Sequence, residues 1–226
     1  QGEKVFENAM QIKGLLKDIY NICPASDEVR GEVRIAISLF IRACLLPRDI
    51  RLFFDKYPEL SVVSILKDDE PDMNDMSYEI GVTSKKPDDN ADVVVYYIKK
   101  VQCGFFASPG YLSQYGYPVD MDDMLKNYRL VSKTGNAAFI RGWKDILKKA
   151  HCSYETNGMF AVREMVDFGV GIGVLPMRFK DEGLVCLDNI KCESDLTFYL
   201  LARNGSKDLP RVRIVLDYYK ELLSRF

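Results

Sequence analysis

Short polar side chains precede two apolar helical patterns, and this arrangement could bind a small anion. Ser38 follows an alternating apolar run, and Thr156 and Asn157 stand just before a run with helical spacing. Helix N-termini present unpaired N–H groups and the positive end of the helix dipole, so two of them facing one cleft could hold a small organic anion. The same residue types are the preferred caps of ordinary helices, so taken singly each motif is more often structural.

No catalytic constellation accompanies these caps. The sequence lacks a GxSxG elbow, an HExxH pair, a P-loop and a GxGxxG turn. His151 is the single histidine and stands in a polar run that is typical of a surface segment. The acidic segment 68–75 lacks the spacing and the glycine of an EF-hand, so we interpret it as a solvated loop. The sequence therefore predicts a protein that is not an enzyme and needs no metal or cofactor.

Composition argues against two kinds of partner. The 226 residues carry a formal net charge of −2 and a pI of about 5.6, so they lack the basic excess of a nucleic-acid-binding surface. The apolar run 38–46 is interrupted by Arg42 and is far shorter than the ~20 residues of a membrane span. The first ten residues lack the pattern of a secretory signal, and a chain that starts at Gln1 is expected to be processed or a fragment.

Six cysteines stand at irregular spacing in a chain too large to need disulfide staples. We therefore expect reduced thiols and a cytoplasmic location. Cys44 and Cys103 lie in apolar runs and are predicted to be core residues. Cys186 and Cys192 are close enough in sequence for a redox switch, but nothing marks either as a reactive thiolate, so that hypothesis stays open.

The stretch Gly31–Pro58 predicts a strand, a loop and a helix. Alternation of apolar and polar residues over 32–37 is typical of a strand with one buried face. Helical spacing follows over 46–57, with Pro47 in the first turn and Pro58 as the stop. Ligands of open α/β sheets bind at the carboxyl ends of such strands, so Ser38 is predicted to lie at a binding edge.

A second unit of similar kind follows at Tyr154–Pro176. Thr156 and Asn157 are predicted to cap a helix, and Gly169 is predicted to end it. The strand predicted at 170–176 comes next. One side of the helix is predicted to carry the apolar residues Phe160, Val162, Met165, Val166 and Phe168.

The remaining elements are predicted from periodicity and turn signals. A helix over 3–22 has a narrow apolar stripe near heptad spacing, which suits a two-helix seam; packing on its own domain is the alternative. Residues 133–150 give no clear pattern. Strands are predicted at 60–66, 78–82, 92–98, 101–107, 129–132, 184–187 and 195–202, and helices at 108–116, 121–128 and 209–226.

The order of several motifs resembles the effector-binding domain of LysR-type transcriptional regulators. These motifs are GEVRIAIS…LLPRDIRLFFDKYPELSV, YEIGVT, FFASPGYLSQYGYP and NGMFAVREMVDFGVGIGVLP. The resemblance covers residues 31–226, and it implies an α/β fold of the periplasmic-binding-protein type II class, with two subdomains joined by two crossover strands. Residues 31–104 and 203–226 would form regulatory subdomain I, 106–200 subdomain II, and 1–22 the linker helix. The crossovers would fall near Cys103–Phe106 and Thr197–Leu201.

The resemblance implies that the chain senses a small organic metabolite in the cleft between subdomains and works as a homodimer or homotetramer. DNA would be bound only by a winged helix–turn–helix domain preceding Gln1, and no membrane would be involved. Lys133 would suit a carboxylate, whereas Phe40, Met159 and Phe160 would suit an apolar part of an anionic effector. The effector-binding positions implied are Ser38, Leu39, Phe40, Thr83, Ser84, Ser132, Lys133, Thr134, Thr156, Asn157, Gly158, Met159 and Gly171.

Two departures from the family pattern leave the identity of the effector open. Glu79 stands where the family usually has aspartate, and residues 134–150 match poorly. A free-standing solute-binding protein of the same fold is the alternative function, and an enzyme on this fold is a third.

Overall fold

The computed structural model describes residues 2, 4–5, 29–45, 49–67, 71–73, 75, 77–88, 92–134, 146, 148–150, 152–193 and 195–225. The linker helix predicted over 3–22 falls outside these residues, apart from Lys4 and Val5, which are helical. Most of the unclear stretch 133–150 falls outside them too. Among the described residues, no helix has the length and apolarity needed to span a membrane.

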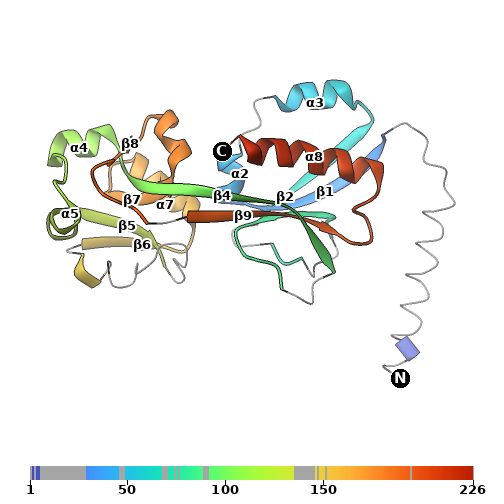
Figure 1. Cartoon of the computed structure of the whole chain (residues 1–226), viewed down its shortest axis with the longest axis horizontal. Coiled ribbons are helices and arrows are strands. Elements are labelled where there is room, and N and C mark those ends of the chain that lie inside the picture. The colour runs from blue at the N-terminus through green and yellow to red at the C-terminus, as the bar shows by residue number, and fades with distance from the viewer. Residues whose placement is uncertain are drawn as a thin grey trace.

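Two α/β lobes lie side by side and are joined by two strands, β4 (Val93–Ala107) and β9 (Asp195–Arg203) (Figure 1). The strand order among the described residues is β2-β1-β3-β9-β4-β7-β5-β6, with β8 pairing to β4. β4 pairs with β9 up to Gln102 and with β7 from Cys103, so it crosses from one lobe to the other at this point. The fold is mixed α/β, as predicted.

The first lobe is built on three parallel strands. β1 (Gly31–Ser38) pairs with β2 (Leu60–Lys67) and with β3 (Ile80–Thr83), and β9 runs antiparallel to β3. Helix α8 (Pro210–Ser224) packs on β1, β4 and β9 through its predicted apolar side. Helix α3 (Ile50–Lys56) lies beside α8, with the Phe53 and Tyr218 rings 4.5 Å apart (Figure 1).

A buried arginine fastens a loop to the other face of this sheet. The Arg203 guanidinium donates to the carbonyl of Tyr78 at 2.8 Å and of Met73 at 2.9 Å, and also to the carbonyl of Asp75. The Met73 side chain then lies over Gly81, where an added Cβ would stand 2.3 Å from its sulfur. Arg203 therefore supplies the hydrogen bonds that the backbone of this loop cannot make for itself.

The second lobe is also built on parallel strands. β5 (Arg129–Lys133) pairs with β6 (Cys152–Thr156) and β7 (Ile172–Pro176), and β4 closes the sheet in the antiparallel direction. Its other elements are α4 (Pro109–Tyr115), α5 (Met121–Asn127), α7 (Met159–Asp167), the 3₁₀ helix η1 (Met177–Glu182) and the short β8 (Val185–Cys186).

Most predicted elements are confirmed, and the errors have local causes. The strands predicted at 92–98 and 101–107 are one strand, β4, whereas β6 and η1 were not predicted. Helix α4 begins and ends as its sequence indicates, with Ser108 as the N-cap and Gly116 as the C-cap. Phe168 was wrongly placed on the buried side of α7; it is the C-cap residue and is 74% exposed, whereas the buried side of the helix carries Val162 and Val166.

Candidate functional site

The carboxyl ends of the parallel strands in both lobes point toward the lobe junction (Figure 1). β1 and β3 end at Ser38 and Thr83 in the first lobe, and β5 and β6 end at Lys133 and Thr156 in the second. These polar ends are therefore gathered at the junction from segments that are far apart in the sequence.

The strand register sets the spacing of these two rows. Thr83, at the end of the first row, pairs with Tyr199 on β9, and Tyr199 pairs in turn with Ile98 on β4. The second lobe begins further along β4, where Cys103 pairs with Pro176 of β7. The five-residue step from Ile98 to Cys103 corresponds to about 17 Å of extended strand. Part of this span is taken up by α2 (Leu39–Cys44), which contacts α7 of the second lobe.

Ser38 is the last residue of β1 and the N-cap of α2. Its Oγ accepts a hydrogen bond from the Ile41 N–H at 3.3 Å, and its side chain is buried. The sequence predicted a loop here and a helix from about Pro47. That prediction is wrong in part, because α2 begins directly at Leu39 and the second helix begins at Ile50.

The side chains of α2 do not all face the strand ends. Leu39 is partly exposed, whereas Phe40 is 7% exposed and its ring centroid lies 6.3 Å from that of Phe179 in η1. Phe40 was expected near an effector. Its ring packs against Phe179 of the second lobe.

Thr83 is a buried hydroxyl at the end of β3. Its Oγ1 accepts a hydrogen bond from the Lys85 N–H at 3.0 Å, which turns the chain sharply after the strand. Ser84 is partly exposed beside it. Tyr199, which pairs with Thr83, adjoins this row and was not anticipated, because its strand pattern carries no signal for a site.

Ser132 differs from the other buried hydroxyls of the junction. It is 2% exposed, and its Oγ has no hydrogen-bond partner among the described residues. Lys133, the next residue, is half-buried, and the exposed Thr134 donates its N–H to the Thr156 carbonyl at 2.7 Å. A buried hydroxyl without a partner costs free energy. Because Ser132 lies near the carboxyl end of its strand, a ligand bound there could accept the missing hydrogen bond.

The start of α7 is not capped as predicted. Thr156 completes β6, Asn157 is exposed, and the N-cap is Gly158, whose extended backbone (φ −117°, ψ 131°) begins the helix without any capping side chain. The prediction failed because strand β6 was missed, so that the helix start was placed one or two residues early. Met159 and the residue after it are partly buried against the core.

Gly171 is not brought together with the other predicted positions. It immediately precedes β7, beside Arg129 at the start of β5, and so lies at the opposite end of the sheet from Lys133. A Cβ on Gly171 would stand 2.4 Å from the Arg129 carbonyl oxygen. Close backbone packing therefore accounts for this glycine.

The described residues hold no group of histidine, cysteine or acidic side chains suited to a metal ion. His151 and Asp68–Glu70 lie outside them. Cys44 and Cys103 are buried, as predicted, and burial raises the pKa of the Cys44 thiol. Burial also raises the pKa of Cys186 to about 12 and that of Cys192 to about 11, so neither is an activated thiolate.

Comparison with known proteins identifies the architecture. The family described as the LysR substrate binding domain matches residues 26–224. The regulatory domain of CrgA from Neisseria meningitidis superposes with a TM-score of 0.73 at 17% identity, over 86% of this chain and 99% of that one. The AmpR effector-binding domain from Citrobacter freundii superposes with a TM-score of 0.66 at 14% identity, over 87% of this chain and 100% of that one.

A longer chain is similar as well. The full-length Vibrio cholerae virulence activator AphB gives a TM-score of 0.62 at 16% identity, over 100% of this chain and 79% of that one. At such identities these likenesses show the fold alone. A comparison of the sequence with curated proteins finds no match.

Proposed function

Because this chain belongs to the LysR substrate-binding domain family, we propose that it senses a small organic anion held between its two lobes and thereby controls transcription. Domains of this family are regulatory rather than enzymatic. The family match favours this function over a free-standing solute-binding protein.

The observation that carries the proposed effector site is the unpartnered hydroxyl of Ser132. It stands at the carboxyl end of a parallel strand, where ligands of open α/β sheets bind, and it faces no hydrogen-bond partner among the described residues. In the other lobe, Ser38 is the last residue of β1 and Thr83 is the last residue of β3, so their hydroxyls also lie at strand ends. An effector that accepts a hydrogen bond from Ser132 would remove the cost of burying it unpaired.

The negative charge of the effector is inferred from Lys133 and α7. Lys133 follows Ser132 directly and would pair with a carboxylate. Glycine at the N-cap leaves the first turn of α7 without a capping side chain, and such N–H groups favour an anion. The further positions proposed for the site are Leu39, Ser84, Thr134, Thr156, Asn157 and Met159.

The biological setting is proposed from the family. We infer a homodimer or homotetramer in the cytoplasm, with DNA bound by a winged helix–turn–helix domain that would precede Gln1. The two lobes would be the two regulatory subdomains, divided at β4 and β9.

Thermal-shift screening of the chain against a library of small organic acids tests the effector site. A ligand that binds the folded state raises the melting temperature by mass action. Ser132→Ala should weaken binding of the acid found in this screen by about tenfold, the effect of one lost hydrogen bond to a charged group. Ser206→Ala is the matched control, because the Ser206 hydroxyl is equally unpartnered but lies in the turn before α8.

A second pair of variants tests the charge of the effector. Lys133→Met should weaken binding of the acid but not of its methyl ester, whereas the exposed Lys126→Met on α5 should change neither.

Equal responses to the acid in Ser132→Ala and Ser206→Ala would show that the effector does not contact Ser132.

A further inference from the structure

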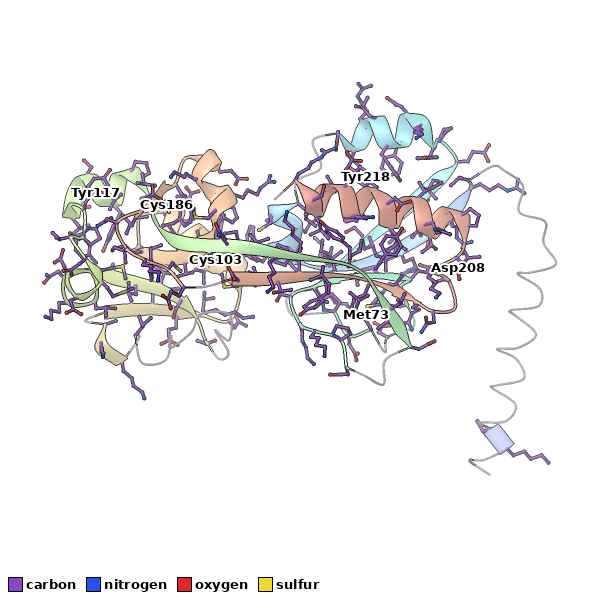
Figure 2. All side chains as sticks on the ribbon, viewed as in Figure 1. Met73, Cys103, Tyr117, Cys186, Asp208 and Tyr218 are labelled. Carbon is purple, nitrogen blue, oxygen red and sulfur yellow. The ribbon has the colours of Figure 1, made fainter. Side chains whose placement is uncertain are left out.

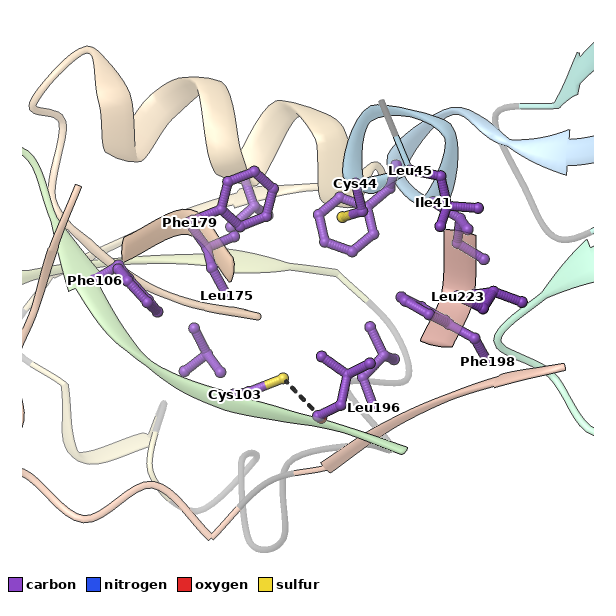
Figure 3. Close-up of a cluster of buried hydrophobic side chains, with 14 of the residues drawn as sticks. Ile41, Cys44, Leu45, Cys103, Phe106, Leu175, Phe179, Leu196, Phe198 and Leu223 are labelled. Atoms are coloured by element: carbon purple, nitrogen blue, oxygen red, sulfur yellow. Dashed lines mark hydrogen bonds between the residues drawn. The ribbon is translucent and has the colours of Figure 1, made fainter. Parts of the chain in front are cut away.

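One apolar core runs through both lobes. Helix α2 of the first lobe contributes Ile41, Cys44 and Leu45, which are almost fully buried. Figure 3 shows them facing apolar side chains of the second lobe and of the crossover strands. The partners labelled there are Cys103, Phe106, Leu175, Phe179, Leu196 and Phe198; Leu223, also labelled, comes from α8 of the first lobe. A contiguous core is what a single domain normally has, so these lobes are packed as one unit.

One contact between the lobes within this core joins two aromatic rings. Phe40 in α2 and Phe179 in η1 have ring centroids 6.3 Å apart at an interplanar angle of 37°, within the range of favourable aromatic pairs. The Arg163 guanidinium of α7 lies 5.8 Å from the Phe179 centroid, on the second lobe. Phe179 is 1% exposed, so its ring is held by both lobes at once.

Three charged side chains of the second lobe lie near one another and influence a residue of α2. Arg163 and Arg178 both approach the Glu182 carboxylate, at 3.9 Å and 3.4 Å. Burial raises the pKa of the Cys44 thiol, and Arg178, Glu182, Cys103 and Arg163 are the nearby groups that also act on that pKa. Cys44 belongs to the first lobe by sequence, yet Arg163, Arg178 and Glu182 all belong to the second.

We propose that α2 and its Phe40–Phe179 contact form an inter-lobe latch, which holds the two lobes in one arrangement in the unliganded chain. Ser38 both ends β1 and caps α2, so the latch begins one residue beyond a proposed wall of the effector site. An effector would then act by shifting α2 within a packed junction rather than by closing an open hinge. This last consequence rests on the proposed function, whereas the latch itself does not.

Hydrogen exchange of the unliganded chain tests the latch. Phe179→Leu changes only the second lobe, and it should speed exchange of the α2 amides by about tenfold, the upper end of what an aromatic pair contributes. Phe53→Leu is the matched control, because Phe53 packs on Phe54, Tyr57 and Tyr218 within the first lobe. That variant should leave exchange in η1 unchanged.

The outcome separates the latch from ordinary core packing. Faster exchange in both η1 and α2 supports the latch, whereas faster exchange confined to η1 and its own lobe overturns it. If Phe179→Leu does not fold, Phe40→Leu is used in its place. This variant changes only the first lobe, so faster exchange of the η1 amides supports the latch and unchanged exchange there overturns it. No effector is present in these measurements, so failure of the latch and failure of the proposed effector site are distinguishable.

Discussion

Replacing Ser132 by alanine should make the unliganded chain more stable, although most core substitutions destabilise. A buried hydroxyl without a partner costs about 1–3 kcal/mol, and the Ser132 hydroxyl has no partner among the described residues. Removing one oxygen also leaves a small cavity, which offsets part of the gain. We therefore expect a net stabilisation of about 1 kcal/mol.

Two other buried serines provide the comparison. Ser108 accepts a hydrogen bond from the Tyr111 N–H at 3.2 Å and caps α4, and Ser38 caps α2 through Ile41. Replacing an N-cap serine by alanine costs about 1 kcal/mol, so Ser108→Ala and Ser38→Ala should both destabilise. The three variants make the same chemical change in equally buried places, and only the hydrogen-bond partner differs.

Thermal and urea unfolding of the unliganded variants measure the effect. At this chain length, 1 kcal/mol shifts the melting temperature by about 2–4 °C, upward for Ser132→Ala and downward for the two cap variants. A fall in the Ser132→Ala melting temperature similar to that of Ser108→Ala would refute the reasoning, because it would mean that the hydroxyl is paired in the folded state. Ser132→Ala should therefore gain stability and lose affinity for the effector, which is the trade-off expected of a residue in a binding site.

Three further outcomes follow from the structure. Gly171→Ala should destabilise by about 2–3 kcal/mol through its clash with the Arg129 carbonyl, whereas Gly110→Ala in α4 has open space and should be neutral or slightly stabilising in urea melts. Arg203→Met should lower the urea midpoint by an amount equivalent to about 2–3 kcal/mol, because it leaves buried carbonyls unpaired. An unchanged midpoint would contradict the role of Arg203 in holding the loop that contains Met73 and Tyr78. Alkylation of Cys192 at pH 8 should be about 100-fold slower than for a free thiol and should rise with pH up to about 11, since burial raises its pKa from about 9 to about 11. Mass spectrometry of the alkylated protein measures this rate, and a rate that levels off below pH 9 would contradict the assigned burial.

The sequence predicted those parts of the fold whose signals are local. Strands such as β1 and helix α4 were placed within a residue or two, because alternation and the Ser108–Pro109–Gly116 signals each lie within a few residues. The resemblance to the LysR-type effector domain is confirmed by the family match over residues 26–224. That prediction rested on the order and spacing of several weak motifs, because no single motif was sufficient.

The candidate site was predicted less well. Helix α2 was read as a loop because six residues give too little periodicity to distinguish a short helix from a connection. Asn157 was assigned a capping role that falls to Gly158, since β6 extends to Thr156 and moves the helix start. Gly171 was placed near the site by family resemblance, whereas its strand register sets it at the far end of β5.

By itself, then, the sequence determined most of the strands and the longer helices, and capping residues such as Ser108, because those properties depend on neighbours within a few positions. Only the tertiary structure decided which of these ends meet. Ser38 and Ser132 are 94 positions apart by their numbers, yet Ser38 ends β1 and Ser132 is the last residue but one of β5, and both strands point to one junction (Figure 1). Whether a buried hydroxyl finds a partner, and whether Phe40 faces a ligand or Phe179, depends on packing between lobes that no local pattern encodes.

Figure 2 makes the same point for side chains. Met73, from a polar loop, lies below the first sheet, and Tyr218 lies on the opposite face with the helices. The sequence marks Met73 only as an apolar residue in an acidic stretch, and it is Arg203, 130 positions away, that holds its backbone in place. Burial energy is gained between residues that are distant in the chain, so it decides the arrangement that local propensities leave open.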